Sequence, residues 1–126
     1  MNTKLLMAAN ALVLGLMGVG LSFLPEEIAT TIDLKSDTII LQLVGALYLG
    51  FALLNWMNKE KILGGIYGRP IVMANFAHFL IGGMALIKLT LNGSGSTALH
   101  LLTIIYAVFG TAFAIKAFTH PKLKED

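Results

Sequence analysis

Four apolar blocks, each about 20 residues long, constrain the fold of this chain more than any other feature. They cover approximately residues 5–24, 38–57, 70–90 and 98–118. A helix of about 20 residues rises about 30 Å, the thickness of the hydrocarbon core of a bilayer. All acidic residues lie outside the blocks, and the block lysines Lys88 and Lys116 lie near ends, where their side chains reach the polar interface. The pattern predicts four membrane-spanning helices.

The composition argues against a soluble four-helix bundle. Hydrophobic residues make up 56% of the 126 residues and charged residues only 13%, whereas about a quarter of a typical soluble domain is charged. The blocks also lack the polar outer face of a soluble amphipathic helix. We therefore expect an all-α integral membrane protein with a single domain over residues 1–126. Short connections predict an antiparallel four-helix bundle, surrounded by membrane lipids and without a nucleic-acid partner.

The first block also resembles a signal peptide. It follows Lys4, and Gly18 and Gly20 are small residues of the kind found at a cleavage site. We expect the segment to remain uncleaved as the first span.

Lysine and arginine predict the topology, because cytoplasmic loops are enriched in them. With a cytoplasmic N-terminus, the outside carries only Lys35 and Lys88. The inside then carries Lys4, Lys59, Lys61, Arg69, Lys116, Lys122 and Lys124. We expect a bacterial cytoplasmic (inner) membrane protein with both termini in the cytoplasm. On the outer side, Pro25 followed by two glutamates predicts a short surface helix over about residues 25–34.

Five polar side chains are predicted to meet in the cytoplasmic half of the bundle. Depths counted at about 1.5 Å per residue place an asparagine from each of the first three spans in the inner leaflet, with a histidine and a tyrosine just above. The set is Asn10, Tyr48, Asn55, Asn75 and His78. Either these groups line a ligand-binding pocket, or they only form hydrogen bonds that hold the helices together, each pair contributing about 0.6 to 2 kcal/mol. The sequence leaves both alternatives open.

The turn between the second and third blocks has two interpretations. Its glycines expose backbone amides, and Lys59, Lys61 and Arg69 add positive charge, which suits an anionic lipid headgroup. The alternative is a simple cytoplasmic reversal, in which Pro70 occupies the first turn of the third span.

Small residues at four-residue spacing predict close contacts between helices, since lipid provides no hydrophobic drive for association. The predicted packing positions are Gly15, Gly18, Gly50, Gly110 and Ala114. The same faces suit contacts with another subunit.

Several chemistries are argued against by the sequence. The absence of cysteine excludes disulfides and thiolate metal sites. His78 and His100 differ in depth by about 15 Å, too much to share one haem. Proton-coupled exporters of similar size depend on a membrane-embedded carboxylate, and the blocks contain none. We expect no catalytic residue, no metal and no evident cofactor.

The layout of the whole chain resembles the small four-span bacterial membrane proteins grouped as DoxX-like. The resemblance lies in Leu24, Pro25 and Glu26 after the first span, the second-span glycines Gly45 and Gly50, and a basic glycine-rich turn that ends at Gly68 and Arg69. Some such proteins are associated with quinone-using oxidoreductase complexes. The resemblance implies an accessory subunit or a binder of a hydrophobic ligand.

Three functions remain as expectations. The first is a non-catalytic accessory or stabilising subunit, in contact with other membrane subunits or with further copies of itself. The second is a binder of a lipid, a quinone or another apolar ligand in the predicted inner-leaflet pocket. The third is an oligomeric transporter or pore, because four helices alone enclose no path.

Overall fold

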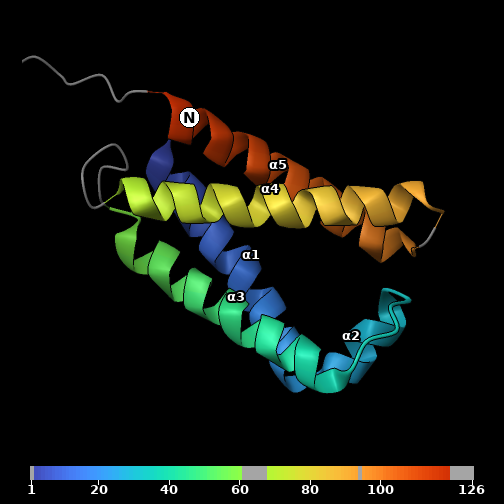
Figure 1. Cartoon of the computed structure of the whole chain (residues 1–126). Coiled ribbons are helices and arrows are strands. Elements are labelled where there is room, and N and C mark those ends of the chain that lie inside the picture. The colour runs from blue at the N-terminus through green and yellow to red at the C-terminus, as the bar shows by residue number, and fades with distance from the viewer. Residues whose placement is uncertain (1, 61–67, 94, 120–126) are drawn as a thin grey trace, which may run out of the picture.

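The computed structural model describes residues 2–60, 68–93 and 95–119, which form five α-helices and no strand (Figure 1). The helices are α1 (Thr3–Phe23), α2 (Pro25–Thr31), α3 (Thr38–Asn58), α4 (Arg69–Leu91) and α5 (Thr97–Phe118). All except α2 are long and apolar enough to cross a membrane. The all-α fold and the four apolar helices are confirmed. The predicted surface helix is present as α2, although it ends at Thr31.

The helix ends follow from local sequence. The Asn2 side chain caps α1 by accepting hydrogen bonds from the backbone N–H groups of Lys4 and Leu5, at 3.0 and 3.4 Å. Proline occupies the first turn of both α2 and α4, where its missing N–H costs nothing. Ser96 caps α5 through the N–H of Leu99 at 3.4 Å.

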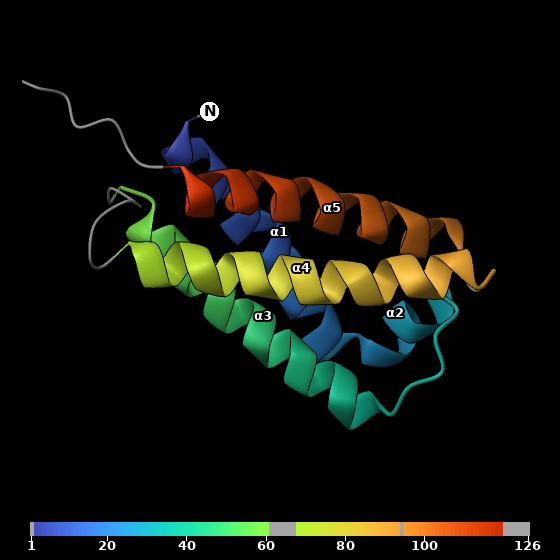
Figure 2. The same ribbon diagram turned by 45° about the horizontal axis from the view of Figure 1, so that its top comes forward.

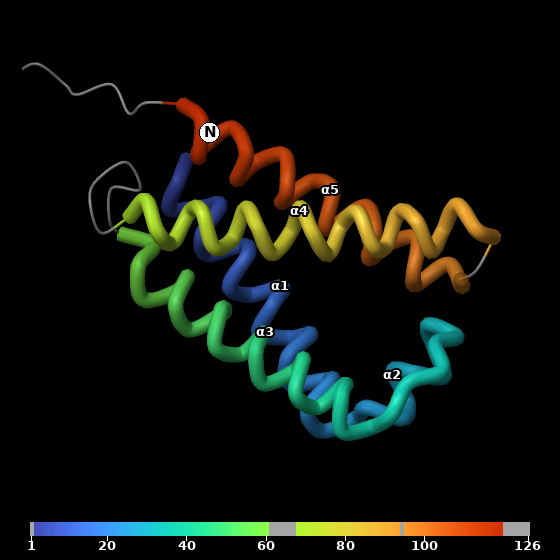
Figure 3. Tube along the Cα trace, viewed as in Figure 1, coloured from blue at the N-terminus to red at the C-terminus, as the bar shows by residue number. Residues whose placement is uncertain are grey.

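The long helices form two antiparallel pairs. Helix α1 packs along α3, and α4 packs along α5, whereas α3 and α4 meet over a much shorter stretch (Figures 1 and 2). The pairs meet at the end where α1 begins and α5 ends, and they separate toward the end that carries α2 (Figure 3). A cleft lined by residues of α1, α2, α3 and α5 lies on that side.

The crossing of α1 and α3 depends on glycine. A Cβ atom at Gly18 would lie 2.9 Å from the carbonyl oxygen of Gly45, and one at Gly45 would lie 2.8 Å from the backbone nitrogen of Ser22. Both distances are too short for a real side chain, so the two backbones touch directly. Such close approach through small residues is typical of helix contacts in membranes.

The pairing of α4 with α5 relies on aromatic side chains. Phe79 is buried and lies against Phe109 and Phe113, with ring centroids 5.3 and 6.0 Å apart. Gly110 faces Phe79, and a Cβ there would lie at an ordinary contact distance of 3.5 Å from the Phe79 Cβ.

The other predicted packing positions differ in their surroundings. A Cβ at Gly15 would meet the Ala52 Cβ at an ordinary 3.7 Å, and Ala114 is half-buried. Gly50 is exposed and would meet nothing within 4 Å. Gly15, Gly18 and Gly110 therefore face other helices of this chain, and Gly50 faces outward.

Candidate functional site

Three asparagines from three helices form a closed cluster where the helix pairs meet. Asn75 of α4 is its centre: its Oδ1 accepts hydrogen bonds from the Nδ2 groups of Asn10 (2.9 Å) and Asn55 (2.8 Å). Its own Nδ2 donates to the Oδ1 of Asn55 at 2.7 Å and to the carbonyl of Ile71 at 2.9 Å. This cluster joins the α4–α5 pair to both helices of the other pair.

The asparagine cluster has no free volume that a ligand could reach. All three side chains have 0% of their surface exposed. The Oδ1 of Asn10 is the one buried side-chain atom without a hydrogen-bond partner in the part of the chain that the structure describes. Buried amides of this kind stabilise helix contacts in a membrane.

A second polar group connects Tyr48, Tyr106 and His78. The two tyrosine hydroxyls are hydrogen-bonded to each other, and the Tyr106 hydroxyl lies 3.1 Å from Nε2 of His78. The imidazole is stacked on Phe51, with a centroid distance of 5.3 Å, and contacts the edge of Phe79 at 4.9 Å. We call Tyr48, Tyr106 and His78 the tyrosine–histidine chain. It joins α3, α4 and α5.

The tyrosine–histidine chain lies at the middle of the spans. Tyr48 is the eleventh of the 21 residues of α3, and Tyr106 is the tenth of the 22 residues of α5. His78 is the tenth of the 23 residues of α4. These polar atoms therefore lie near mid-length of three helices that are each long and apolar enough to cross a membrane. Hydrogen-bonding groups without partners are costly in such apolar surroundings.

An apolar cleft of about 540 Å³ begins at Tyr48 and opens toward α2. Its walls come from α1, α2, α3, α5 and the segment between α2 and α3, and they include Met17, Ile28, Val44, Ala98 and Leu102. The polar residues among the described lining are Tyr48 and Ser36. The volume falls within the range of about 300–1,000 Å³ that is usual for small-molecule sites.

The structure divides the five residues of the predicted pocket into two groups. Asn10, Asn55 and Asn75 do meet, and they form hydrogen bonds with one another, although the Oδ1 of Asn10 keeps no partner. Tyr48 and His78 belong to the separate chain, and only Tyr48 lines the cleft. Tyr106 was not among the site residues predicted from the sequence. Its mid-span depth was the available signal, but depth did not show that its side chain turns toward His78.

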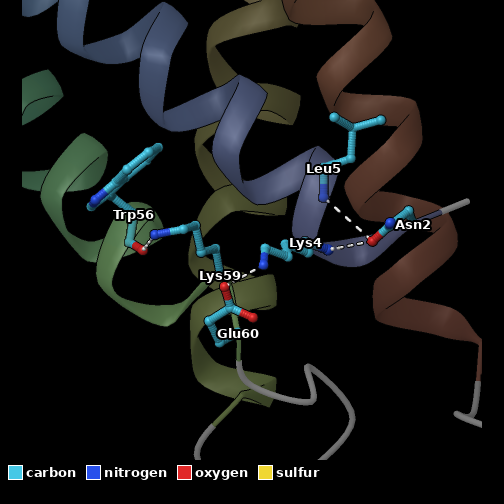
Figure 4. A network of polar contacts seen from close by, with 6 residues as sticks. All are labelled: Asn2, Lys4, Leu5, Trp56, Lys59 and Glu60. Atoms are coloured by element: carbon cyan, nitrogen blue, oxygen red, sulfur yellow. Dashed lines mark hydrogen bonds and ion pairs between the residues drawn. The ribbon is translucent and has the colours of Figure 1, made fainter.

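The structure describes two of the three basic positions predicted to hold a headgroup, Lys59 and Arg69. Lys59 lies over the Trp56 ring, with its Nζ 3.7 Å from the ring centroid, and donates a hydrogen bond to the Trp56 carbonyl (Figure 4). Arg69 begins α4 and is exposed, and Lys61 lies outside the described residues. Nearby, Lys4 forms an ion pair with Glu60 at 2.5 Å, which links α1 to the end of α3 (Figure 4).

Metal binding receives no support from the described part of the chain. Residues 2–60, 68–93 and 95–119 contain no group of three or more His, Cys, Asp or Glu side chains placed to share an ion.

Comparisons with known proteins found no match to any protein family, curated protein or solved structure. The resemblance to DoxX-like proteins therefore stays a prediction from the sequence, and the function must be argued from the geometry.

Proposed function

We propose that this chain is a non-catalytic integral membrane protein that binds one apolar molecule, such as a lipid or a quinone, in the cleft between its helix pairs. The observation that carries the proposal is the position of the cleft. It is bounded by apolar side chains of four helices and is lined at one end by Tyr48, a hydrogen-bonding residue at mid-length of α3. A molecule bound there would cover the apolar walls of the cleft, and its polar group would form a hydrogen bond with Tyr48.

The asparagine cluster and the tyrosine–histidine chain would have different roles. The asparagine cluster holds the helix pairs together at one end, which lets them separate at the other end without falling apart. The separation creates the cleft. The proposal therefore moves the ligand away from the asparagines, to the α2 side of the tyrosine–histidine chain.

The charge distribution supports an orientation. The start of α1, the end of α3 and the start of α4 lie at the end of the molecule opposite α2 (Figure 1), and they carry Lys4, Lys59 and Arg69. By the positive-inside rule this end faces the cytoplasm of a bacterial inner membrane. The cleft then opens in the outer half of the bilayer, under α2.

Filling the cleft tests the proposal. Ala98 of α5 lines the cleft, whereas Ala107 lies on the opposite, exposed face of the same helix. We expect Ala98→Trp to abolish retention of apolar molecules after extraction in mild detergent, as measured by native mass spectrometry. Ala107→Trp is the matched control and should retain them. Equal adducts on both variants would show that the cleft is not the binding site.

A second function, assembly with another subunit or a second copy, is favoured by one observation on α3. Gly50 and Ala46 form the floor of a shallow groove between Leu43, Leu47 and Leu54, and a side chain at Gly50 would touch nothing in this chain. We expect Gly50→Leu to disperse such an assembly while leaving the fold intact. Native mass spectrometry of the variant checks this, with Ala107→Trp as a control for added bulk elsewhere on the surface. An unchanged subunit composition would argue against assembly through α3.

A further inference from the structure

The tyrosine–histidine chain ends at a hydroxyl whose hydrogen-bonding role can be reversed. If Nε2 of His78 accepts from Tyr106, then Tyr106 accepts from Tyr48, and the Tyr48 oxygen keeps a free lone pair. If Nε2 donates to Tyr106, the Tyr106 O–H is released to donate to Tyr48, and the Tyr48 O–H is then free to donate elsewhere. The tautomer of the imidazole thus determines whether the Tyr106 proton is available to Tyr48.

The lining of the cleft selects against charge. Tyr48 and Ser36 are the polar residues among the described lining, and none of that lining is acidic or basic. A charged group at the depth of Tyr48 would have no counter-ion and no water, which makes its burial costly. A neutral oxygen has no such cost and can form a hydrogen bond with Tyr48.

Depth restricts the ligand further. The polar end of the cleft is near the bilayer centre, about 15 Å from either headgroup layer. A phospholipid keeps its charged headgroup in that layer, so only its tails would reach Tyr48. The hydrogen-bonding end of the fitting molecule must therefore be small and neutral, with the apolar body extending toward α2.

Resting on the proposed function, we infer that the ligand is a neutral amphiphile with a hydroxyl or carbonyl group at its buried end, bound to the Tyr48 hydroxyl. An alcohol donates to Tyr48 in one state of the chain and accepts from it in the other. A ketone accepts only.

Competition for the cleft by molecules with the same tail tests this inference. The purified full-length protein in non-ionic detergent is loaded with tritiated hexadecanol. Unlabelled hexadecanol, a methyl ketone of similar chain length, hexadecane, palmitate and hexadecyltrimethylammonium are then added, at a pH where palmitate is ionised. We expect the alcohol and ketone to displace the label at least tenfold more effectively than the two ions, with hexadecane in between.

Two hydroxyl deletions locate the polar group. Tyr48→Phe removes the hydroxyl at the deep end, and Ser36→Ala removes the one near α2. We expect Tyr48→Phe to weaken retention of hexadecanol about two- to tenfold and to leave hexadecane competition unchanged. Ser36→Ala should retain hexadecanol like the parent protein. The reverse result would place the polar group at the mouth and overturn the inference.

The remaining outcomes separate the inference from the proposed function. Equal competition by all five molecules would mean that the cleft recognises only the tail; the proposed function would survive and the inference would fail. Strong competition by palmitate would place a charged head at the mouth, beside Lys35, and would also overturn it. If no labelled alcohol is retained and no competitor binds, the proposed function fails as well. The competition series uses the unmodified protein, so it does not depend on whether a variant folds.

Discussion

The asparagine cluster and the tyrosine–histidine chain are both polar groups inside apolar helices, yet their surroundings differ. The amides come from α1, α3 and α4, are fully buried, and bond to one another. The tyrosine–histidine chain comes from α3, α4 and α5. Its imidazole packs against phenylalanine rings, and its Tyr48 lines an apolar cleft. The asparagines bond to one another away from solvent, whereas the tyrosine–histidine chain borders a cleft.

This difference separates a structural contact from a candidate binding site. A buried polar group that is hydrogen-bonded to its neighbours stabilises the helix contact and is not accessible to a ligand. A group whose last member borders a cleft retains some hydrogen-bonding capacity for a guest. Access, more than residue type, is therefore the property to test.

The largest effect on stability is expected from Asn75→Ala. The change removes three hydrogen bonds to other side chains and one to the Ile71 carbonyl, and it leaves the amides of Asn10 and Asn55 buried without their shared partner. We expect a loss of about 2 to 3 kcal/mol in the free energy of unfolding, measured by SDS titration in mixed micelles. Asn58→Ala is the control, because Asn58 bonds only to the Leu54 carbonyl of its own helix. Equal losses of stability for the two variants would contradict a stabilising role of the asparagine cluster.

The next effect concerns the glycine crossing that holds α1 against α3. Gly45→Ala puts a Cβ 2.8 Å from the Ser22 nitrogen and 2.9 Å from the Gly18 carbonyl oxygen. We expect α1 and α3 to be forced apart at a cost of about 1 to 3 kcal/mol, measured in the same titration. Gly50→Ala, with nothing within 4 Å, should be neutral or slightly stabilising. A neutral Gly45→Ala would contradict the close crossing.

A smaller effect is expected from Tyr106→Phe, which removes the hydroxyl in the middle of the tyrosine–histidine chain. The loss should be about 1 kcal/mol, because one hydroxyl bonded to two neighbours is removed and the ring remains in place. Retention of tritiated hexadecanol should also fall, since Tyr48 loses the partner that orients it. Thr111→Val on the same helix serves as the control, because its hydroxyl bonds only to the Ala107 carbonyl. A stability loss as large as that of Asn75→Ala, with unchanged retention of hexadecanol, would show that the tyrosine–histidine chain only stabilises the helix contacts, like the asparagines.

The smallest effect is expected at the exposed ion pair beside the asparagine end. The Lys4 and Glu60 side chains are 57% and 62% exposed, so solvent and salt screen their attraction. We expect Lys4→Ala to cost about 0.5 kcal/mol or less, and the cost should shrink as salt is added. The measurement is the same unfolding titration at two ionic strengths. A loss above 1 kcal/mol that does not change with salt would mean that this ion pair, and not the asparagine cluster, holds the helices together at this end of the molecule.

The sequence by itself determined the helices and several of their ends. Long apolar blocks have one solution in lipid, because a helix satisfies every backbone group internally. Pro25, Pro70 and Ser96 then begin helices for local reasons that need no tertiary contact. Depth counting also placed Asn10, Asn55 and Asn75 in the same half of the bundle, and they do meet.

Only the tertiary structure decided which polar residues face one another and where space remains. A residue count gives height along a helix, but neither the tilt of the helix nor the direction of a side chain. The contact of Gly18 with Gly45 brings α1 and α3 together. The packing of the two helix pairs places Tyr48 beside Tyr106, apart from the asparagines, and leaves the cleft between Tyr48 and α2. These relations depend on packing between distant segments, which no local pattern in the sequence encodes.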